Sequence, residues 1–364
     1  MSSLPNANRG FLSFLGLALW LPLATLVCRF QDQTTALAFE MTSPRPTWPH
    51  TRREFAEWPN AYRRYFNAHF GLRAWLMKAH AALKIQVFQV SSSDKVILGR
   101  NNWLFYAGGG ALDDFRHTQP FTAEELSTWK TALEARRNWL QQRGIQYLFF
   151  VAPNAQTIYP EKMPAEIRPV APMSRLDQLT AYMQAHSDVQ MVDLRPELMA
   201  AKQSDQIYFK TDTHWNQLGA FVAYGKLAPR LQAMFPNWRP DEIANFDRVE
   251  TQEWSGDLAA ILATAHFRET RVELVRKRPE VSGDPVSAAI ERPFIHLTSS
   301  GGELRSLVAF RDSFFAAEAE FIARHFRHTL LVSSTDFDPV IVEREQPELV
   351  IQELVERSLM SVKP

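Results

Sequence analysis

Two short segments of the chain hold the residue types that nucleophilic catalysis requires. The first contains Asp212 and His214, two positions apart and just before an expected helix. In an extended segment residues i and i+2 project to the same side, so one loop could present the carboxylate and the imidazole together. The second contains Ser313, where an apolar stretch runs directly into an expected helix. A serine hydroxyl needs a base that is oriented by a third group, so the three side chains together suggest a Ser-His-Asp triad.

In such a triad His214 would take the proton of Ser313, and Asp212 would fix the tautomer of the imidazole. The spacing does not establish this, because Asp-x-His pairs also occur by chance. By spacing alone, a helix N-cap is the more ordinary role for Ser313. A metal site at Asp212 and His214 is a poorer interpretation, since no second histidine or thiolate lies nearby in the sequence.

The elements around these residues are expected to alternate between helices and strands. Thr122-Ala-Glu-Glu125 is a capping box that opens a helix, and Gly144 ends that helix. The apolar run 145–152 suits a strand covered on both faces. Further helices are expected at about 174–186, 216–235 and 314–326, and further strands at 189–194, 304–310, 329–333 and, running into a short helix, in 347–357.

This alternation predicts an α/β fold with a mostly parallel sheet and helices on both of its faces. Reactive groups on such a sheet belong at the carboxyl ends of the strands. Residues 239–300 do not fit the alternation, and we expect them to form a loop-rich insertion or cap.

The amino-terminal part of the chain has a different composition. Residues 11–28 form an apolar run without a charged side chain, between Arg9 and Arg29. About 20 such residues can cross a bilayer as a helix, and the run lacks a small-x-small cleavage site. We therefore expect a signal-anchor in residues 1–30, with a cleaved signal peptide as the alternative, in which case the chain would be periplasmic. A proline-rich spacer (31–51), a helical lead-in (52–95) and a catalytic domain (96–364) would follow.

The composition excludes several classes of protein. The 364 residues carry 40 Lys plus Arg and 40 Asp plus Glu, a net charge of zero that argues against a nucleic-acid binder. The single cysteine, Cys28, excludes an intramolecular disulfide framework and a zinc site built on thiolates.

Several motifs resemble, in order, the SGNH-hydrolase-like domain of the alginate O-acetyltransferases. The resemblance covers about residues 67–359, and in it the Asp-x-His pair precedes the serine, a circular permutation of the usual SGNH order. It implies a three-layer α/β/α fold. The matching segments are Gly99-Arg-Asn-Asn-Trp-Leu-Phe-Tyr106, Ala152-Pro-Asn-Ala-Gln-Thr-Ile-Tyr-Pro160, Thr211-Asp-Thr-His-Trp-Asn216, Gly256-Asp-Leu-Ala259, Arg311-Asp-Ser-Phe314 and Pro347-Glu-Leu-Val-Ile351.

Carried over position by position, the triad of that family falls on Asp212, His214 and Ser313. Three further candidates for oxyanion or substrate binding accompany it. Asn154 follows an expected strand and would donate to the oxyanion, or serve as an ordinary turn residue. Trp215 would stack on a sugar, or pack behind the histidine. Arg311 stands where many SGNH enzymes have a glycine.

The resemblance implies that Ser313 accepts an acetyl group and passes it to a hydroxyl of an extracytoplasmic polysaccharide, an alginate-like exopolysaccharide or a cell-wall polymer. No cofactor is expected. A membrane-bound O-acyltransferase would supply the acetyl groups, and the chain would lie on the periplasmic side of the inner membrane. Two alternatives stay open, a polysaccharide acetylesterase with the same triad and an inactive membrane-tethered scaffold that binds polysaccharide.

Overall fold

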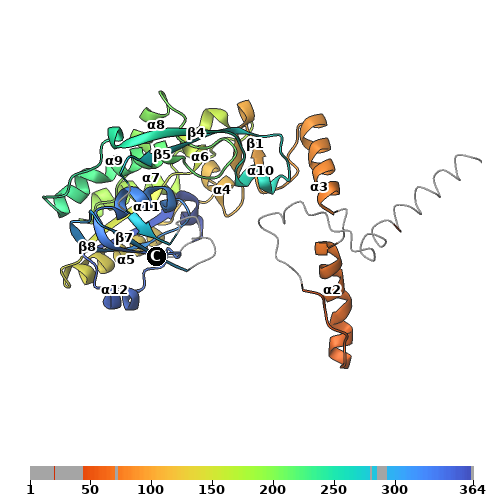
Figure 1. Ribbon diagram of the computed structural model, residues 1–364, viewed down its shortest axis with the longest axis horizontal. Coiled ribbons are helices and arrows are strands. Elements are labelled where there is room, and N and C mark those ends of the chain that lie inside the picture. Colours follow the sequence, from red (N-terminus) through yellow and green to blue (C-terminus); the bar gives the residue numbers. More distant parts are fainter. Residues whose placement is uncertain (1–19, 21–43, 70–72, 279–280, 285–292, 362–364) are drawn as a thin grey trace, which may run out of the picture. The chain divides into compact units, whose positions relative to one another are not determined.

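The computed structural model describes residues 20, 44–69, 73–278, 281–284 and 293–361 (Figure 1). The chain divides into two compact units, one of residues 1–93 with 259–266 and one of residues 94–258 with 267–364. Apart from Trp20, the expected membrane segment 11–28 lies outside the described residues. Within the described ranges, no helix combines the length and the apolar character needed to cross a bilayer.

The first unit contains the helices expected in the lead-in. These are α2 (Arg52–His69), α3 (Arg73–Ala82) and a short π-helix, Leu83–Val87. Helix α2 buries none of its side chains. Its aromatic residues stack along one side, with Trp58 5.0 Å from Tyr62 and Tyr65 4.5 Å from His69, measured between ring centroids.

The second unit is built on one sheet of six strands. Along the sheet the order is β3 (Gln146–Ala152), β10 (Leu349–Val355), β8 (Leu304–Phe310), β9 (Phe326–Val332), β7 (Phe294–Ser299) and β6 (Val281–Gly283). The first four strands are parallel, whereas β7 and β6 are antiparallel to their neighbours. The sheet is therefore mixed: three of its five strand pairings are parallel, as the expectation of a mostly parallel sheet requires, and the antiparallel edge formed by β7 and β6 was not predicted.

The antiparallel edge of the sheet comes from the stretch that did not fit the alternation. Strand β7 alternates between exposed and buried side chains, as a strand with one solvated face does, whereas β10 is buried along its whole length. Both β6 and β7 come from residues 239–300. The same stretch holds β4 (Phe246–Trp254) and β5 (Glu269–Arg276), which form an antiparallel ribbon. The stretch is thus rich in strands, and the loop-rich description was wrong.

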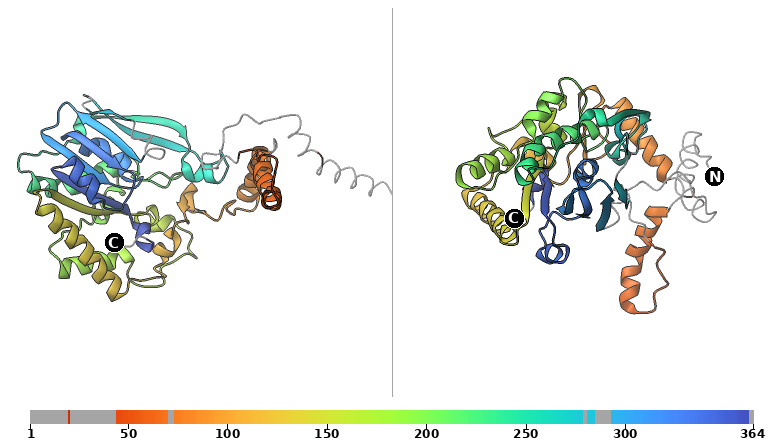
Figure 2. Two further views of the ribbon diagram at one scale, coloured as in Figure 1. Left: turned by 90° about the horizontal axis from the view of Figure 1, so that it is seen from below. Right: turned by 60° about the vertical axis from the view of Figure 1, so that its left-hand side comes forward.

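Helices cover both faces of the sheet, which gives three layers (Figure 2). Phe149 and Val151 of β3 share one apolar cluster with α5 (Ala123–Gln141) and α7 (Arg175–His186), joined by α12 (Pro339–Glu345). Leu148 and Phe150, which alternate with them, share the other cluster with α9 (Gln217–Met234) and α11 (Phe315–Ala323). The remaining elements are β1 (Val96–Leu98), β2 (Leu104–Tyr106), α4 (Ala111–Arg116), α6 (Ala155–Ile158), α8 (Arg195–Ala201), α10 (Asp257–Ile261) and a 3-10 helix at Glu356–Met360.

Local signals in the sequence were accurate where the hydrogen bonds are local. The capping box forms as expected, because the Thr122 hydroxyl accepts from the backbone of Glu125 and the Glu125 side chain accepts from the backbone of Thr122. The strand expected at 189–194 is absent. Only an isolated parallel bridge joins Val192 to Phe150 there, because α8 begins at Arg195 and ends the extended run.

Candidate active site

The candidate site lies at the carboxyl edge of the parallel strands. Strands β3, β10 and β8 run in the same direction, so the residues that follow them emerge at one edge of the sheet. Ser313 follows β8, and Asn154 follows β3. Strand β10 lies between those two strands, so Asn154 comes from a strand that is not the neighbour of the strand carrying the serine.

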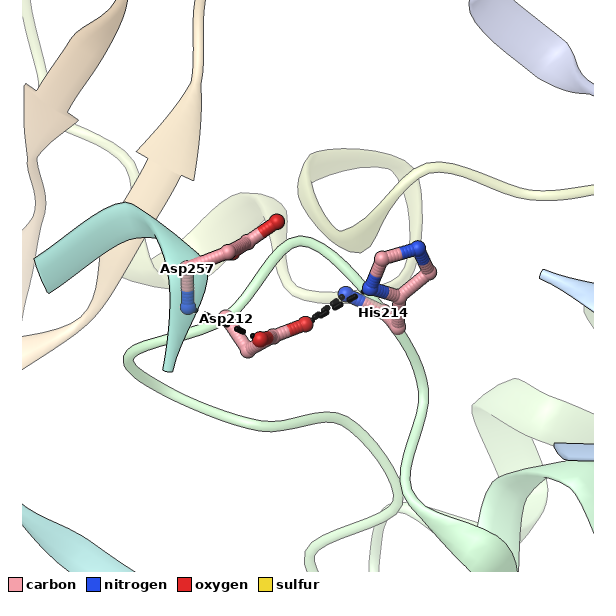
Figure 3. Close-up of side chains that lie close together, drawn as sticks. All are labelled: Asp212, His214 and Asp257. Carbon is pink, nitrogen blue, oxygen red and sulfur yellow. Dashed lines mark hydrogen bonds and ion pairs between the residues drawn. The ribbon is translucent and has the colours of Figure 1, made fainter. Parts of the chain in front are cut away.

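The structure brings Asp212, His214 and Ser313 together. His214 Nε2 lies 2.7 Å from Ser313 Oγ, and His214 Nδ1 lies 2.7 Å from Asp212 Oδ1. The backbone N–H of His214 also donates to Asp212 Oδ1, at 3.0 Å. A neutral imidazole that donates Nδ1–H to the carboxylate leaves Nε2 free to accept the serine proton. In Figure 3 the Nδ1 side of the imidazole faces Asp212 and the other ring nitrogen points away from it.

The pKa values of the histidine and the aspartate are shifted in opposite directions. Burial alone would lower the pKa of His214, but the hydrogen bond to Asp212 and its charge outweigh burial and raise it. Burial alone would raise the pKa of Asp212, but the hydrogen bond and charge of His214 outweigh it and lower the pKa. Both shifts stabilise the imidazolium and carboxylate pair, which is the state formed when Ser313 gives its proton to His214.

Ser313 does not cap helix α11. The residue before the helix is Phe314, and the carboxylate of Asp312 accepts its backbone N–H at 2.9 Å. The other oxygen of Asp312 accepts the backbone N–H of Val355 at 2.6 Å, which ties the loop to β10. The N-cap interpretation of Ser313 was therefore wrong. Within the described residues the backbone N–H of Ser313 has no hydrogen-bond partner, so it is available to a ligand.

Gly256 and Asp257 support the triad from the side of Asp212. The backbone N–H of Asp257 donates to Asp212 Oδ2 at 2.9 Å, as Figure 3 shows. A Cβ at Gly256 would lie 2.4 Å from the Cβ of Asp212, so only glycine allows this approach. The carboxylate of Asp257 accepts both the backbone N–H and the hydroxyl of Thr213, each at 2.8 Å. The sequence marked this pair only as a shared motif and gave no indication of its role.

Glu269 holds the same loop from another direction, and sequence reasoning missed it. One carboxylate oxygen accepts the N–H and the hydroxyl of Thr211 at 2.7 and 2.6 Å, and the other accepts the N–H of Lys210 at 2.9 Å. Glu269 begins strand β5, and no local pattern links it to a loop so far away in the sequence.

Trp215 does not line an acceptor groove. Its side chain is 1% exposed, and its indole N–H donates to the carbonyl of Phe314 at 2.9 Å. The rings of Tyr208 and Phe314 meet it edge to face. Burial thus excludes stacking on a sugar, and Trp215 instead joins the histidine segment to the serine segment.

Arg311 and Asn154 are also buried. Arg311, 3% exposed, donates to the carbonyl of Asp312 and to the hydroxyl of Ser333. Asn154, 2% exposed, donates its side-chain amide to Asp114 at 2.9 Å and accepts from Arg357 at 3.1 Å. Within the described residues neither side chain makes a hydrogen bond to Ser313, and a role of either in oxyanion or substrate binding stays a prediction.

Among the described residues, Asp212, His214 and Asp257 form one group with potential metal-ligand atoms within 4.8 Å of one another. Asp212 Oδ1 faces N–H donors of His214, and Asp212 Oδ2 faces the N–H of Asp257. The carboxylate of Asp257 faces two donors of Thr213. A cation would have to displace these hydrogen bonds, so the arrangement favours the triad over a metal.

The three-layer fold and the linked serine, histidine and aspartate define a protein of the SGNH-hydrolase-like class. Residues 96–290 match the family described as "SGNH hydrolase-like domain, acetyltransferase AlgX", and the chain belongs to this family. The match includes Asp212, His214 and Asp257 and ends before Ser313. The resemblance seen in the sequence is confirmed.

Named relatives agree with this assignment, and a solved structure shares the fold. The chain is 32% identical over 170 residues to the "Probable alginate O-acetylase AlgJ" of Pseudomonas putida, covering 45% of this chain and 40% of that protein. It is 25% identical over 207 residues to the protein of the same name in Pseudomonas syringae pv. tomato, covering 57% and 51%. The chain thus matches about half the length of these relatives or less. The structure of Bacillus cereus PatB1 shares the fold, with a TM-score of 0.53, 16% identity and coverage of 72% of this chain and 96% of that one.

Proposed function

We propose that this protein is a serine-dependent O-acetyltransferase that acetylates hydroxyls of an extracytoplasmic polysaccharide. The observation that carries the proposal is the hydrogen-bonded series from Asp212 through His214 to Ser313. Membership of the family supports acetyl transfer, and the names of the relatives support alginate or a similar polymer as the acceptor.

The first half of the reaction would place an acetyl group on the serine. Ser313 Oγ attacks the acetyl carbonyl while His214 Nε2 takes the serine proton. The carbonyl electrons move onto oxygen, where the N–H of Ser313 can donate. When these electrons re-form the carbonyl, the bond between the acetyl carbon and the oxygen of the acetyl donor breaks. That oxygen leaves with the proton from His214, and acetyl-Ser313 remains.

The second half would repeat these steps with a sugar. A polysaccharide hydroxyl loses its proton to His214 and attacks acetyl-Ser313. The collapse of the second tetrahedral intermediate releases the acetylated sugar, and the proton returns from His214 to Ser313. The same site becomes an esterase if water attacks instead, so the identity of the acceptor separates the two activities.

The remaining parts of the proposal concern location and supply. The apolar run 11–28 supports a membrane anchor that would keep the chain on the periplasmic side of the inner membrane. A membrane-bound O-acyltransferase would then deliver acetyl groups to Ser313 across that membrane.

Incubation with an activated acetyl ester, with and without oligosaccharides, tests the proposal. We expect mass spectrometry to show acetyl-Ser313 and acetylated sugar with the wild type and neither with Ser313→Ala. Ser204→Ala, an exposed serine after α8, is the matched control and should behave as the wild type. Release of acetate without any acetylated sugar would exclude acetyl transfer and support an esterase. Polymer acetylation in cells that is unaffected by Ser313→Ala would exclude both enzymes and support an inactive scaffold that binds polysaccharide.

A further inference from the structure

Arg357 contacts Phe314, the residue after the nucleophile, and apart from its hydrogen bond to Asn154 it has not entered the description of the site. It follows β10, the strand next to the one that carries Ser313. Its guanidinium lies 5.5 Å from the ring centroid of Phe314, the residue after the nucleophile. The same ring also contacts the imidazole of His214, with centroids 4.9 Å apart. Arg357 and His214 therefore both contact the residue that adjoins the serine.

The guanidinium is anchored at one end and free at the other. One of its nitrogens donates to the amide oxygen of Asn154 at 3.1 Å, and Asn154 in turn donates to Asp114 at 2.9 Å. The ring of Tyr106 supports its face at 5.3 Å. Among the described residues no carboxylate lies within 4.0 Å of the Arg357 nitrogens, although a half-buried cation is normally paired. The other donors of the fork are therefore available to a ligand.

The charge of Arg357 acts electrostatically on His214 of the triad. Burial lowers the pKa of Arg357, while the charges of Asp312 and Asp257 favour its charged form. Its positive charge adds to burial in opposing the rise of the pKa of His214. A cation at this place would stabilise negative charge that develops at Ser313, because Coulomb interactions are stronger in a partly buried site than in bulk water.

We propose that Arg357 is a catalytic residue that stabilises the oxyanion formed when Ser313 attacks the acetyl carbonyl, together with the backbone N–H of Ser313. This inference rests on the proposed acyl transfer. Asn154 and Asp114 act as positioning residues that hold the guanidinium. As Ser313 Oγ bonds to the carbonyl carbon, its proton passes to His214 and the carbonyl electrons move to oxygen beside Arg357. The electrons then re-form the carbonyl, and the oxygen of the acetyl donor leaves with the proton from His214.

Burst kinetics with p-nitrophenyl acetate, a small neutral ester, test this role without a sugar acceptor. We expect Arg357→Ala to lower the kcat of Ser313 acetylation about 100-fold, with KM changed by less than about threefold, as for loss of an oxyanion donor. Added guanidinium ion should restore part of the rate to Arg357→Ala. Arg276→Lys is the matched control, because Arg276 also lies over a ring, that of Phe246, but pairs with Asp241 away from the triad.

The outcomes separate this inference from the proposed function. If the wild type never forms acetyl-Ser313, both are overturned. If the wild type forms it and a folded Arg357→Ala forms it at the same rate, only the role of Arg357 is overturned. A loss confined to transfer onto an acidic oligosaccharide would show that Arg357 binds an acceptor carboxylate and would equally overturn it. Should Arg357→Ala not fold, Arg357→Lys and Asn154→Ala provide the same comparison, with an expected loss of about tenfold each.

Discussion

The two loops that carry the triad are held in different ways. The histidine loop (residues 206–216) lies between α8 and α9 and is fixed by carboxylates from distant parts of the chain, Glu269 and Asp257. The serine loop (residues 311–314) leads directly from β8 into α11, and Asp312 within it makes the fixing hydrogen bonds. The position of Ser313 is thus set by the sheet, whereas that of His214 is set by tertiary contacts. This contrast predicts that activity is more easily lost from the histidine side.

The largest effect is expected where the histidine loop supplies chemistry. Asp212→Asn should lower kcat for acetylation of Ser313 about 10⁴-fold, because the histidine loses the partner that fixes its tautomer.

The pKa of His214 is raised by Asp212, and acetylation requires the neutral imidazole, so the wild-type rate should rise with pH through a midpoint above 6.5. In Asp212→Asn that midpoint should move down. Rates of the burst across pH measure both effects, and an unchanged midpoint would contradict the assignment.

Gly256→Ala tests whether the support of Asp212 is steric. The new methyl group would meet the Cβ of Asp212 at 2.4 Å and push the carboxylate away from His214. We expect kcat to fall about 100-fold, as for a misplacement of about 1 Å. Gly225→Ala in α9 is the control, because its Cβ meets nothing within 4 Å, and it should keep full activity. Equal activities for the two variants would show that Asp212 does not depend on this contact.

Glu269→Gln examines the remote support of the histidine loop. The amide would place a donor against backbone N–H groups of Lys210 or Thr211, which should cost about 1–3 kcal/mol of stability. We expect kcat to fall about tenfold as the loop loosens. Glu250→Gln, on the exposed face of β4, should change neither quantity. Thermal unfolding and burst kinetics measure both, and a loss of stability with unchanged kcat would separate Glu269 from the placement of His214.

Trp215→Phe tests the contact between the loops and should have the smallest effect. The substitution removes the indole N–H that donates to the carbonyl of Phe314 but keeps most of the packing. We expect a loss of about 1 kcal/mol in the free energy of unfolding and a decrease of only a few-fold in kcat. Denaturant unfolding and burst kinetics are the measurements. A larger loss of kcat than in Glu269→Gln would mean that this contact, rather than the carboxylates, places His214.

The sequence predictions were accurate where the interacting residues lie close together in the chain, and they failed where those residues lie far apart. The capping box at Thr122, the strand before Asn154 and the turn from strand to helix at Ser313 depend on near neighbours, and all of them form. The Asp212 to His214 contact also spans two positions. The supports at Glu269 and Asp257 lie more than 40 residues from the loop that they hold, so no spacing indicated them.

By itself, the sequence determined the local elements, the side chains able to form a triad and the family, because these depend on residue type and short spacing. The tertiary structure decided which strand lies next to the one that carries the nucleophile. Asn154 follows β3, but β10 pairs between β3 and β8, so the neighbouring strand is the one that Arg357 follows. The order of strands in a sheet arises from long-range pairing, which adjacent residues in the chain do not encode.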